Sequence, residues 1–123
     1  MAKGLRMQVN KVLEDYTDEI IEITAKTAED VAEETVKDLK RSAPRSGRRG
    51  RHYRSGMAVK NTSKSRLYKS YTVYNKNKPQ LTHLLENGHA KVNGGRVEGT
   101  PHWAPAEETA IKDYEDRIVR AIE

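Results

Sequence analysis

The first forty residues carry an apolar stripe with helical spacing and no helix breaker in their interior. Apolar residues recur every three or four positions, and no glycine or proline lies between Gly4 and Pro44. We therefore predict one long helix over residues 3–41. At about 1.5 Å of rise per residue, a helix of about 38 residues is about 57 Å long. Its stripe comprises Leu5, Val9, Val12, Leu13, Tyr16, Ile20, Ile23, Thr27, Val31, Val36 and Leu39.

The chain has too few apolar residues to cover a helix of that length. Of its 123 residues, 35% are hydrophobic and 33% are charged, and none is phenylalanine. Globular domains usually contain about 45–50% apolar residues, so a single domain spanning residues 1–123 can have only a small core. We expect part of the stripe to contact another copy of the chain in a homo-oligomer, or the helix to bend around a sheet.

Charge is divided unevenly along the chain, although the net charge is only +5. Residues 1–40 contain six basic and ten acidic residues, and residues 79–123 contain five basic and eight acidic ones. Residues 41–78 contain twelve basic residues and no acidic one. Such a block attracts acidic protein surfaces or nucleic acid.

The basic block begins with a segment rich in small residues. Residues 42–51 read Ser-Ala-Pro-Arg-Ser-Gly-Arg-Arg-Gly-Arg and predict a flexible loop. Arginines in and beside it could dock on an acidic partner surface, could neutralise phosphates while Tyr53 and Tyr68 stack on bases, or could only add solubility. Because the segment has no recognition helix, we favour docking on a partner surface over sequence reading. The candidate interface residues are Arg45, Arg48, Arg49, Arg51 and Arg54.

The remaining pattern predicts strands, a short helix and a closing helix, which makes the fold class α+β. Residues 52–61 and 66–74 alternate as two strands joined by a turn. Residues 52–104 would contain this small antiparallel sheet, a short middle helix and a second hairpin. A C-terminal helix is expected over residues 105–122, with Pro105 as its first residue.

Turn residues concentrate in the segment 82–108. Gly88 is predicted to end the short helix in a left-handed conformation. Asn93-Gly94 lies between two valine-containing pairs and predicts a two-residue hairpin turn, because both positions of such a turn need positive φ. Trp103, the single tryptophan, is expected to fill the core where the last helix joins the sheet, with an interface anchor as the alternative.

Three short motifs follow one another in this part of the chain: Leu-Leu-Glu-Asn-Gly-His-Ala-Lys at 84–91, Gly-Gly-Arg-Val at 94–97 and Pro-His-Trp-Ala-Pro-Ala at 101–106. With the weaker Ala-Pro-Arg-Ser-Gly at 43–47, they resemble the tail-component family of long-tailed bacteriophages, also called tail-completion or head–tail joining proteins. A tail component of a lambda-like coliphage is the founding member of that family. The resemblance covers roughly residues 38–110. The motif residues that it marks as structural are Leu84, Leu85, Glu86, Gly88, His89, Gly94, Gly95, Pro101, His102, Trp103 and Pro105.

The resemblance implies a structural protein of the virion, at the neck or tail end, that assembles as a ring and helps join or complete the tail at the head–tail interface. Its implied partners are further copies of the chain, in a ring guessed to be sixfold, and other neck and tail proteins. Contact with passing DNA would be non-specific. The alternative is a small basic nucleic-acid-binding protein that acts through the arginine-rich loop. A regulatory or toxin-type enzyme is the less favoured third hypothesis.

No catalytic, cofactor or metal site is expected. The chain has no cysteine, and its four histidines lack the four-residue helical spacing of a metalloprotease site. For His89 and His102 we expect local hydrogen bonds that brace the hairpin. No apolar run approaches the roughly 18 residues of a membrane helix, and no signal peptide follows Met1. We therefore expect a protein that stays out of the membrane and assembles in the host cytoplasm.

Overall fold

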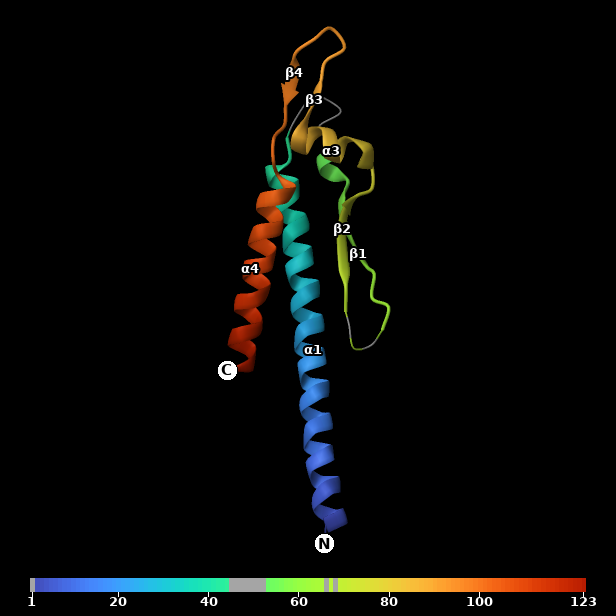
Figure 1. The fold of residues 1–123 in the computed structure, drawn as a ribbon, viewed down its shortest axis with the longest axis vertical. Helices are drawn as coiled ribbons and strands as arrows, with labels where there is room; N and C mark the ends of the chain where they lie inside the picture. The colour runs from blue at the N-terminus through green and yellow to red at the C-terminus, as the bar shows by residue number, and fades with distance from the viewer. Residues whose placement is uncertain (1, 45–52, 66, 68) are drawn as a thin grey trace.

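The computed structural model describes residues 2–44, 53–65, 67 and 69–123, and only the backbone of residues 2–7. It confirms the α+β class, with a long N-terminal helix, small antiparallel sheets, a short middle helix and a C-terminal helix (Figure 1). The elements, in chain order, are α1 (Ala2–Ser42), β1 (Met57–Asn61), β2 (Tyr71–Asn75), α3 (Pro79–Asn87), β3 (Gly88–Ala90), β4 (Arg96–Glu98) and α4 (Trp103–Ile122). None of the helices in these ranges is long and apolar enough to cross a membrane.

The helix α1 covers the predicted residues 3–41 and one further residue at each end. Threonines inside it bond to the helix itself: Thr17 Oγ1 donates to Leu13 O at 2.8 Å, so the hydroxyl does not compete for other backbone groups. The helix ends just before Pro44, because proline disfavours the helical conformation at the preceding Ala43.

The hairpin of β1 and β2 is shorter than predicted. The ladder begins where Met57 pairs with Asn75, not at residue 52, because residues 53–55 form a helical turn instead of a strand. Gly56 N–H donates to Tyr53 O at 3.1 Å and closes that turn. The turn places Tyr53 in the core, whereas a strand would have placed it on the same face as Met57.

The second strand also starts later than predicted. It covers Tyr71–Asn75 instead of residues 66–74. Leu67, expected on the strand, is 57% exposed and lies outside the ladder. No apolar layer covers Leu67, so extending the strand to this residue would bury little apolar surface.

The strands β3 and β4 form the second predicted hairpin, but its turn differs. Residues 91–95 connect the strands, and Lys91 N–H donates to Gly95 O at 3.0 Å. Positive φ falls on Gly94 (89°) and Gly95 (83°). The predicted two-residue turn at Asn93-Gly94 is therefore wrong. Glycine has no Cβ and adopts positive φ at lower cost than asparagine, so the glycine pair takes both positions.

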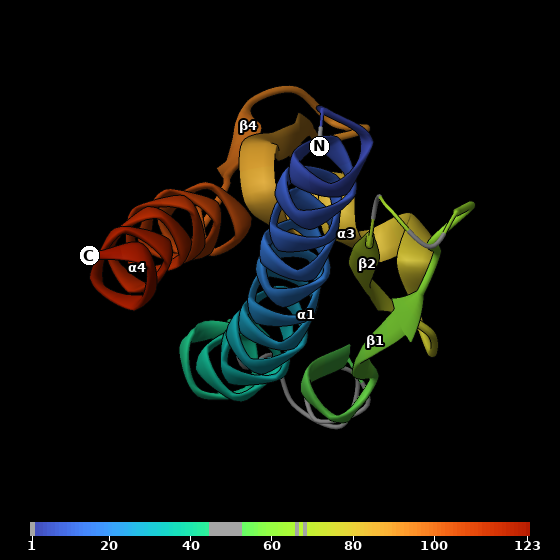
Figure 2. The same ribbon diagram turned by 90° about the horizontal axis from the view of Figure 1, so that it is seen from below.

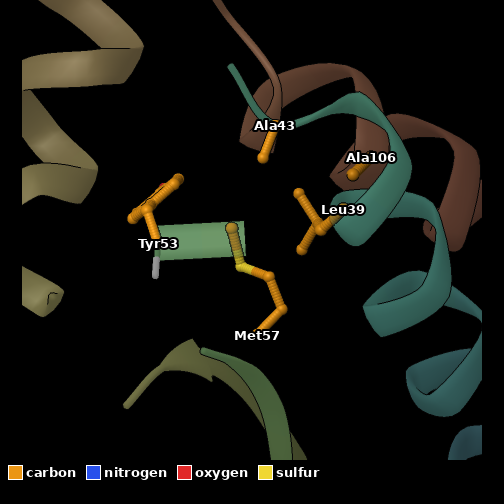
Figure 3. Packing of buried hydrophobic residues seen from close by; sticks show 5 residues of the cluster. All are labelled: Leu39, Ala43, Tyr53, Met57 and Ala106. Atoms are coloured by element: carbon orange, nitrogen blue, oxygen red, sulfur yellow. The ribbon is translucent and has the colours of Figure 1, made fainter. Parts of the chain in front are cut away.

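The buried core lies at the C-terminal end of α1 (Figure 3). There Leu39 of α1 and Ala43, just after its end, meet Tyr53, Met57 and Ala106, all of them at most 7% exposed. The core thus joins α1, the helical turn at 53–55, β1 and α4 at one place. The partly buried residues packed against it are Val36, Val73, Leu81, Leu85 and Trp103.

Both packing partners of α1 lie along its C-terminal half. The helix α4 packs on one side and the β1–β2 hairpin on the other (Figures 1 and 2). The N-terminal part of α1 extends past both of them (Figure 1). On this part Val9, Val12, Leu13 and Tyr16 are 49%, 66%, 58% and 55% exposed. The prediction that the apolar stripe is only partly covered within its own chain is confirmed.

Candidate functional site

The motif residues meet where α3, the β3–β4 hairpin and the start of α4 come together. Glu86 lies in the last turn of α3 and reaches across to α4. Its Oε1 accepts hydrogen bonds from the backbone N–H groups of His102 at 2.8 Å and Trp103 at 2.9 Å. Its Oε2 accepts one from Ala104 at 3.0 Å. A side chain from another element therefore caps the start of α4.

These contacts account for the free N–H groups at the start of α4. A helix leaves its first four N–H groups without an intrahelical acceptor. The helix begins at Trp103 with His102 as its N-cap, not at Pro105 as predicted. Pro105 is the third helical residue, where it has no N–H to satisfy. The proline at a first helical position is instead Pro79, in α3.

The surroundings of Glu86 favour its ionised form. Burial acts to raise the pKa of Glu86, but the three backbone N–H donors outweigh it, and the pKa lies below its ordinary value. The side chain is only 14% exposed. The positive end of the α4 dipole stabilises the same carboxylate. At neutral pH, a charged Glu86 therefore holds the start of α4 against α3.

A chain of hydrogen bonds continues from Glu86 through three rings. His102 Nδ1 lies 3.0 Å from Glu86 Oε1 and 2.8 Å from Thr100 O. Both of these are acceptors, so Nδ1 carries a proton, and in the tautomer protonated at Nδ1 alone Nε2 is an acceptor. Tyr53 OH then donates to Nε2 at 2.6 Å and accepts the indole N–H of Trp103 at 2.9 Å. Each donor in the chain thus has an acceptor.

His102 and Trp103 are also held by burial and by ring packing. His102 is 2% exposed and Tyr53 is fully buried. Their rings meet edge to face with centroids 5.5 Å apart. Trp103 is partly buried against the core. The expected hydrogen bonds of a bracing histidine are present at His102, whereas His89 is exposed on β3.

Two glycines allow the β3–β4 hairpin to lie directly against the end of α3. Gly88 has φ 80° and ψ 179°, a conformation open essentially to glycine alone and different from the left-handed helical one predicted. A Cβ there would overlap the carbonyl oxygen of Val97 and lie 2.7 Å from Gly99 N. A Cβ at Gly99 would overlap Glu86 O. This close backbone approach places Glu86 within reach of α4.

The other motif residues divide between core and surface. Leu85 packs against the core, whereas Leu84 is 39% exposed. Gly94 and Gly95 lie at the tip of the hairpin with open space around their Cβ positions. Pro101 is exposed. The structure therefore brings Glu86, His102 and Trp103 together and leaves the hairpin tip apart from them.

Of the five candidate arginines, the structure describes Arg54. Its Nε donates to Ala43 O at 2.6 Å, and a terminal nitrogen of the same guanidinium donates to Arg41 O at 3.0 Å. The last carbonyls of a helix have no intrahelical partner, so Arg54 caps the C-terminal end of α1. A contact of Arg54 with a partner or with DNA stays a prediction. The candidates that lie outside the described residues are Arg45, Arg48, Arg49 and Arg51.

The part of the chain that the structure describes contains no candidate metal site. No group of three or more His, Cys, Asp or Glu side chains there could hold a metal ion. His83 instead pairs with Asn87 along α3, with Nδ1 and Nδ2 3.1 Å apart. The absence of a cofactor and of enzymatic activity stays a prediction.

A groove of about 630 Å³ opens between α4 and β2, with α1 as its floor. Val31 and Ala32 of α1 form part of the floor, Val73 belongs to one wall, and Ala110 and Ile111 belong to the other. Among the described lining residues, only two glutamates of α4 are charged. The groove is therefore a largely apolar surface.

Sequence reasoning missed Asn75, and it marked Glu86 as a structural motif residue without predicting its capping role. Buried Asn75 donates from Nδ2 to Tyr53 O, and its Oδ1 accepts the N–H groups of Asn77 at 3.1 Å and Lys78 at 2.8 Å. A hydrogen bond from Asn to the backbone two residues on is a known turn pattern, so this contact had a local signal. The cap by Glu86 had none, because its partners lie at least sixteen residues away.

Replacing Tyr53 with phenylalanine is expected to lower the free energy of unfolding by about 1–3 kcal/mol. The substitution removes the hydroxyl that joins His102 to Trp103 and leaves a buried donor and a buried acceptor without partners. Denaturant unfolding followed by Trp103 fluorescence measures the loss. The control is Tyr74→Phe, which keeps the ring beneath the Lys60 ammonium and should change stability by less than about 0.5 kcal/mol. Equal stability of both variants would contradict the hydrogen-bond chain.

Residues 7–88, more than half of the chain, match the family model HK97-gp10_like, described as "Bacteriophage HK97-gp10, putative tail-component". The chain belongs to this family of bacteriophage tail components. No curated protein and no solved structure matches the chain.

The match to the HK97-gp10-like family and the resemblance noted from short motifs cover different ranges. The match begins at residue 7 and so includes most of α1, which the motif resemblance from residue 38 did not. It ends at Gly88 and leaves out the motifs at 94–97 and 101–106. The family is named for phage HK97, and its description does not mention a lambda-like founding member.

Proposed function

We propose that this HK97-gp10-like protein is a structural component of the phage neck or tail end, which assembles as a ring and helps join or complete the tail at the head–tail interface. Family membership together with the exposed apolar stripe on α1 carries the proposal. A tail component works in contact with other phage proteins, and exposed apolar surface of this kind marks such contacts.

Ring assembly is supported by the asymmetric shape of the molecule. The exposed stripe lies on the projecting part of α1, while α4 and the β1–β2 hairpin lie along its other half (Figure 1). One copy can therefore contact two neighbours through two different surfaces. Contacts of this heterologous kind close into a ring when the rotation between copies permits. We propose six copies, with other neck and tail proteins bound above and below.

The protein acts by assembly and not by catalysis in this proposal. It needs no cofactor, assembles in the host cytoplasm and ends in the virion. Native mass spectrometry of the purified protein, together with electron microscopy of particles from a phage lacking the gene, tests it. We expect closed rings of six copies, and separate heads and tails in the absence of the gene. A chain that stays monomeric at micromolar concentration, in a phage whose particles form normally without it, would overturn the proposal.

The second candidate is a nucleic-acid-binding protein, which the charge distribution favours. Residues 41–78 contain twelve basic residues and no acidic one. In the described part of that block, Lys60, Lys64 and Lys69 are exposed on or beside the β1–β2 hairpin. Phosphate contacts of this kind give binding that is strongly salt-dependent and indifferent to sequence.

Replacing Arg48, Arg49 and Arg51 together with alanine separates the two candidates. We expect circular dichroism of the triple variant to match the wild type, while ring formation or head–tail joining decreases, because the arginines would meet acidic surfaces of neighbouring copies. The control removes three exposed basic residues outside the block: Lys91, Lys112 and Arg120. Normal assembly of the arginine variant, with loss of tight DNA binding that the wild type shows, would favour the nucleic-acid candidate.

A further inference from the structure

The exposed stripe on α1 has the spacing of a helix that inserts into a groove. Val9, Val12, Leu13 and Tyr16 occupy positions i, i+3, i+4 and i+7, and each is about half exposed or more. Amphipathic helices that bind apolar grooves present anchors at this spacing. The segment lies beyond the reach of α4 and of the β1–β2 hairpin (Figure 1), so its own chain does not cover it.

The apolar groove between α4 and β2 offers a matching surface on the same molecule. Its floor includes Ala28, Val31 and Ala32, whose short side chains leave room above α1. Ile111, on the α4 wall, is 52% exposed. Among the described residues, the groove thus exposes apolar surface without a covering element.

We infer that the stripe of one copy occupies the groove of a neighbouring copy. This inference rests on the proposed ring and names the surfaces that build it. Charge disfavours the alternative, a pairing between two stripes. Residues 8–22 contain five acidic residues and one basic residue, so two such segments side by side would repel each other.

Beyond its β2 wall, the groove adjoins a basic surface. Its β2 wall includes Thr72, which pairs with Lys60 of β1. The other exposed lysines of this hairpin region are Lys64 and Lys69, and residues 53–78 contain no acidic residue. Glu107 and Glu115 lie on the opposite, α4 wall. An acidic helix in the groove therefore has opposite charge beside it on the side of the hairpin, and we expect its acidic face to point that way.

Stripe and groove lie at different heights along α1. Their centres on α1, near residues 12 and 31, are about 28 Å apart at about 1.5 Å per residue. An antiparallel pair of copies could exchange stripes reciprocally and would stop at a dimer. In the proposed ring, each copy instead inserts its stripe into one neighbour and receives the stripe of another. This is the head-to-tail arrangement from which rings form.

Cysteine cross-linking tests the pairing directly, because the chain has no cysteine of its own. Val12→Cys and Ala110→Cys variants of the full chain are mixed and oxidised. We expect a heterodimeric disulfide between them, at least about tenfold more abundant than either homodimer. The control is Lys11→Cys, which lies one residue from Val12 on the opposite face of α1 and should not cross-link to Ala110→Cys. A chain carrying both Val12→Cys and Ala110→Cys should give a ladder that ends at the number of copies in the ring.

A charge placed in the stripe gives a second measurement. Val12→Asp should weaken assembly at least about tenfold in sedimentation velocity, because it buries an unpaired carboxylate in the groove. Asn10→Asp adds the same charge two residues away, at a position outside the stripe. It should leave assembly within about twofold of the wild type. Circular dichroism should be unchanged for both variants, since residues 10 and 12 are exposed within the monomer.

The outcomes distinguish this inference from the proposed function. Cross-linking of Val12→Cys to itself would show that two stripes pair, and would overturn the inference. Rings that form normally with Val12→Asp, and without the mixed cross-link, would also overturn it while leaving the proposed function standing. A chain that never assembles, in a phage that does not need it, would overturn both.

Discussion

Replacing Glu86 with alanine is expected to lower the free energy of unfolding by about 2–4 kcal/mol. The substitution leaves the N–H groups of His102, Trp103 and Ala104 without their acceptor at the start of α4. Urea unfolding followed by Trp103 fluorescence and by circular dichroism measures the loss. Glu108→Ala, on the exposed side of the same helix, is the control and should change stability by less than about 0.5 kcal/mol. Equal losses in the two variants would contradict the capping role.

A pH series on Glu86→Gln separates the charge of this side chain from its shape. Because folding lowers the pKa of Glu86, its ionisation contributes stability that is fully present above the ordinary value of 4.5. That contribution is lost as the pH falls through the lowered folded-state pKa. The stability difference between wild type and Glu86→Gln should therefore be largest near neutral pH and shrink below pH 4.5. A difference that stays constant down to about pH 2 would show that the carboxylate charge is not involved.

Replacing Gly88 with alanine is expected to lower the free energy of unfolding by about 3 kcal/mol or more. Alanine would have to adopt φ 80° and ψ 179° and place its Cβ against the carbonyl oxygen of Val97. Relief of this overlap moves the hairpin away from α3, and Glu86 then loses its reach to α4. We expect the fluorescence of Trp103 to shift in the folded state as well, because the indole lies at the displaced junction.

The control for Gly88 is Gly94, at the tip of the same hairpin. Gly94 has φ 89°, but nothing lies within 4 Å of a Cβ built on it. Gly94→Ala therefore carries the backbone strain without the overlap, and should cost about 1–2 kcal/mol. If the two alanine variants lost equal stability, backbone strain alone would explain Gly88, and the close packing of β4 on α3 would have no energetic role.

Patterns within a few residues were sufficient to predict most elements of this fold. The uninterrupted three–four spacing predicts α1 to within one residue at each end, because helix formation depends on the side chains of neighbouring turns. The alternating residues before Pro79 predict a strand pair, and Gly88 predicts the end of α3. The chain also has too few apolar residues to cover the whole stripe of a helix this long. The sequence therefore predicts that part of the stripe stays exposed, as Val12 and Tyr16 do.

The tertiary structure alone decided where α4 begins and what holds it. Pro105 is a suitable first helical residue on local grounds, but Glu86 supplies acceptors for N–H groups as early as His102, and the helix therefore starts at Trp103. Tyr53 was expected on a strand and instead joins His102 and Trp103, 49 and 50 residues away. Contacts between residues so far apart in the sequence depend on which surfaces the packed elements bring together. Local residue spacing does not predict such contacts. The junction of α3 and α4 is therefore a product of packing, while the elements that meet there are products of their own sequences.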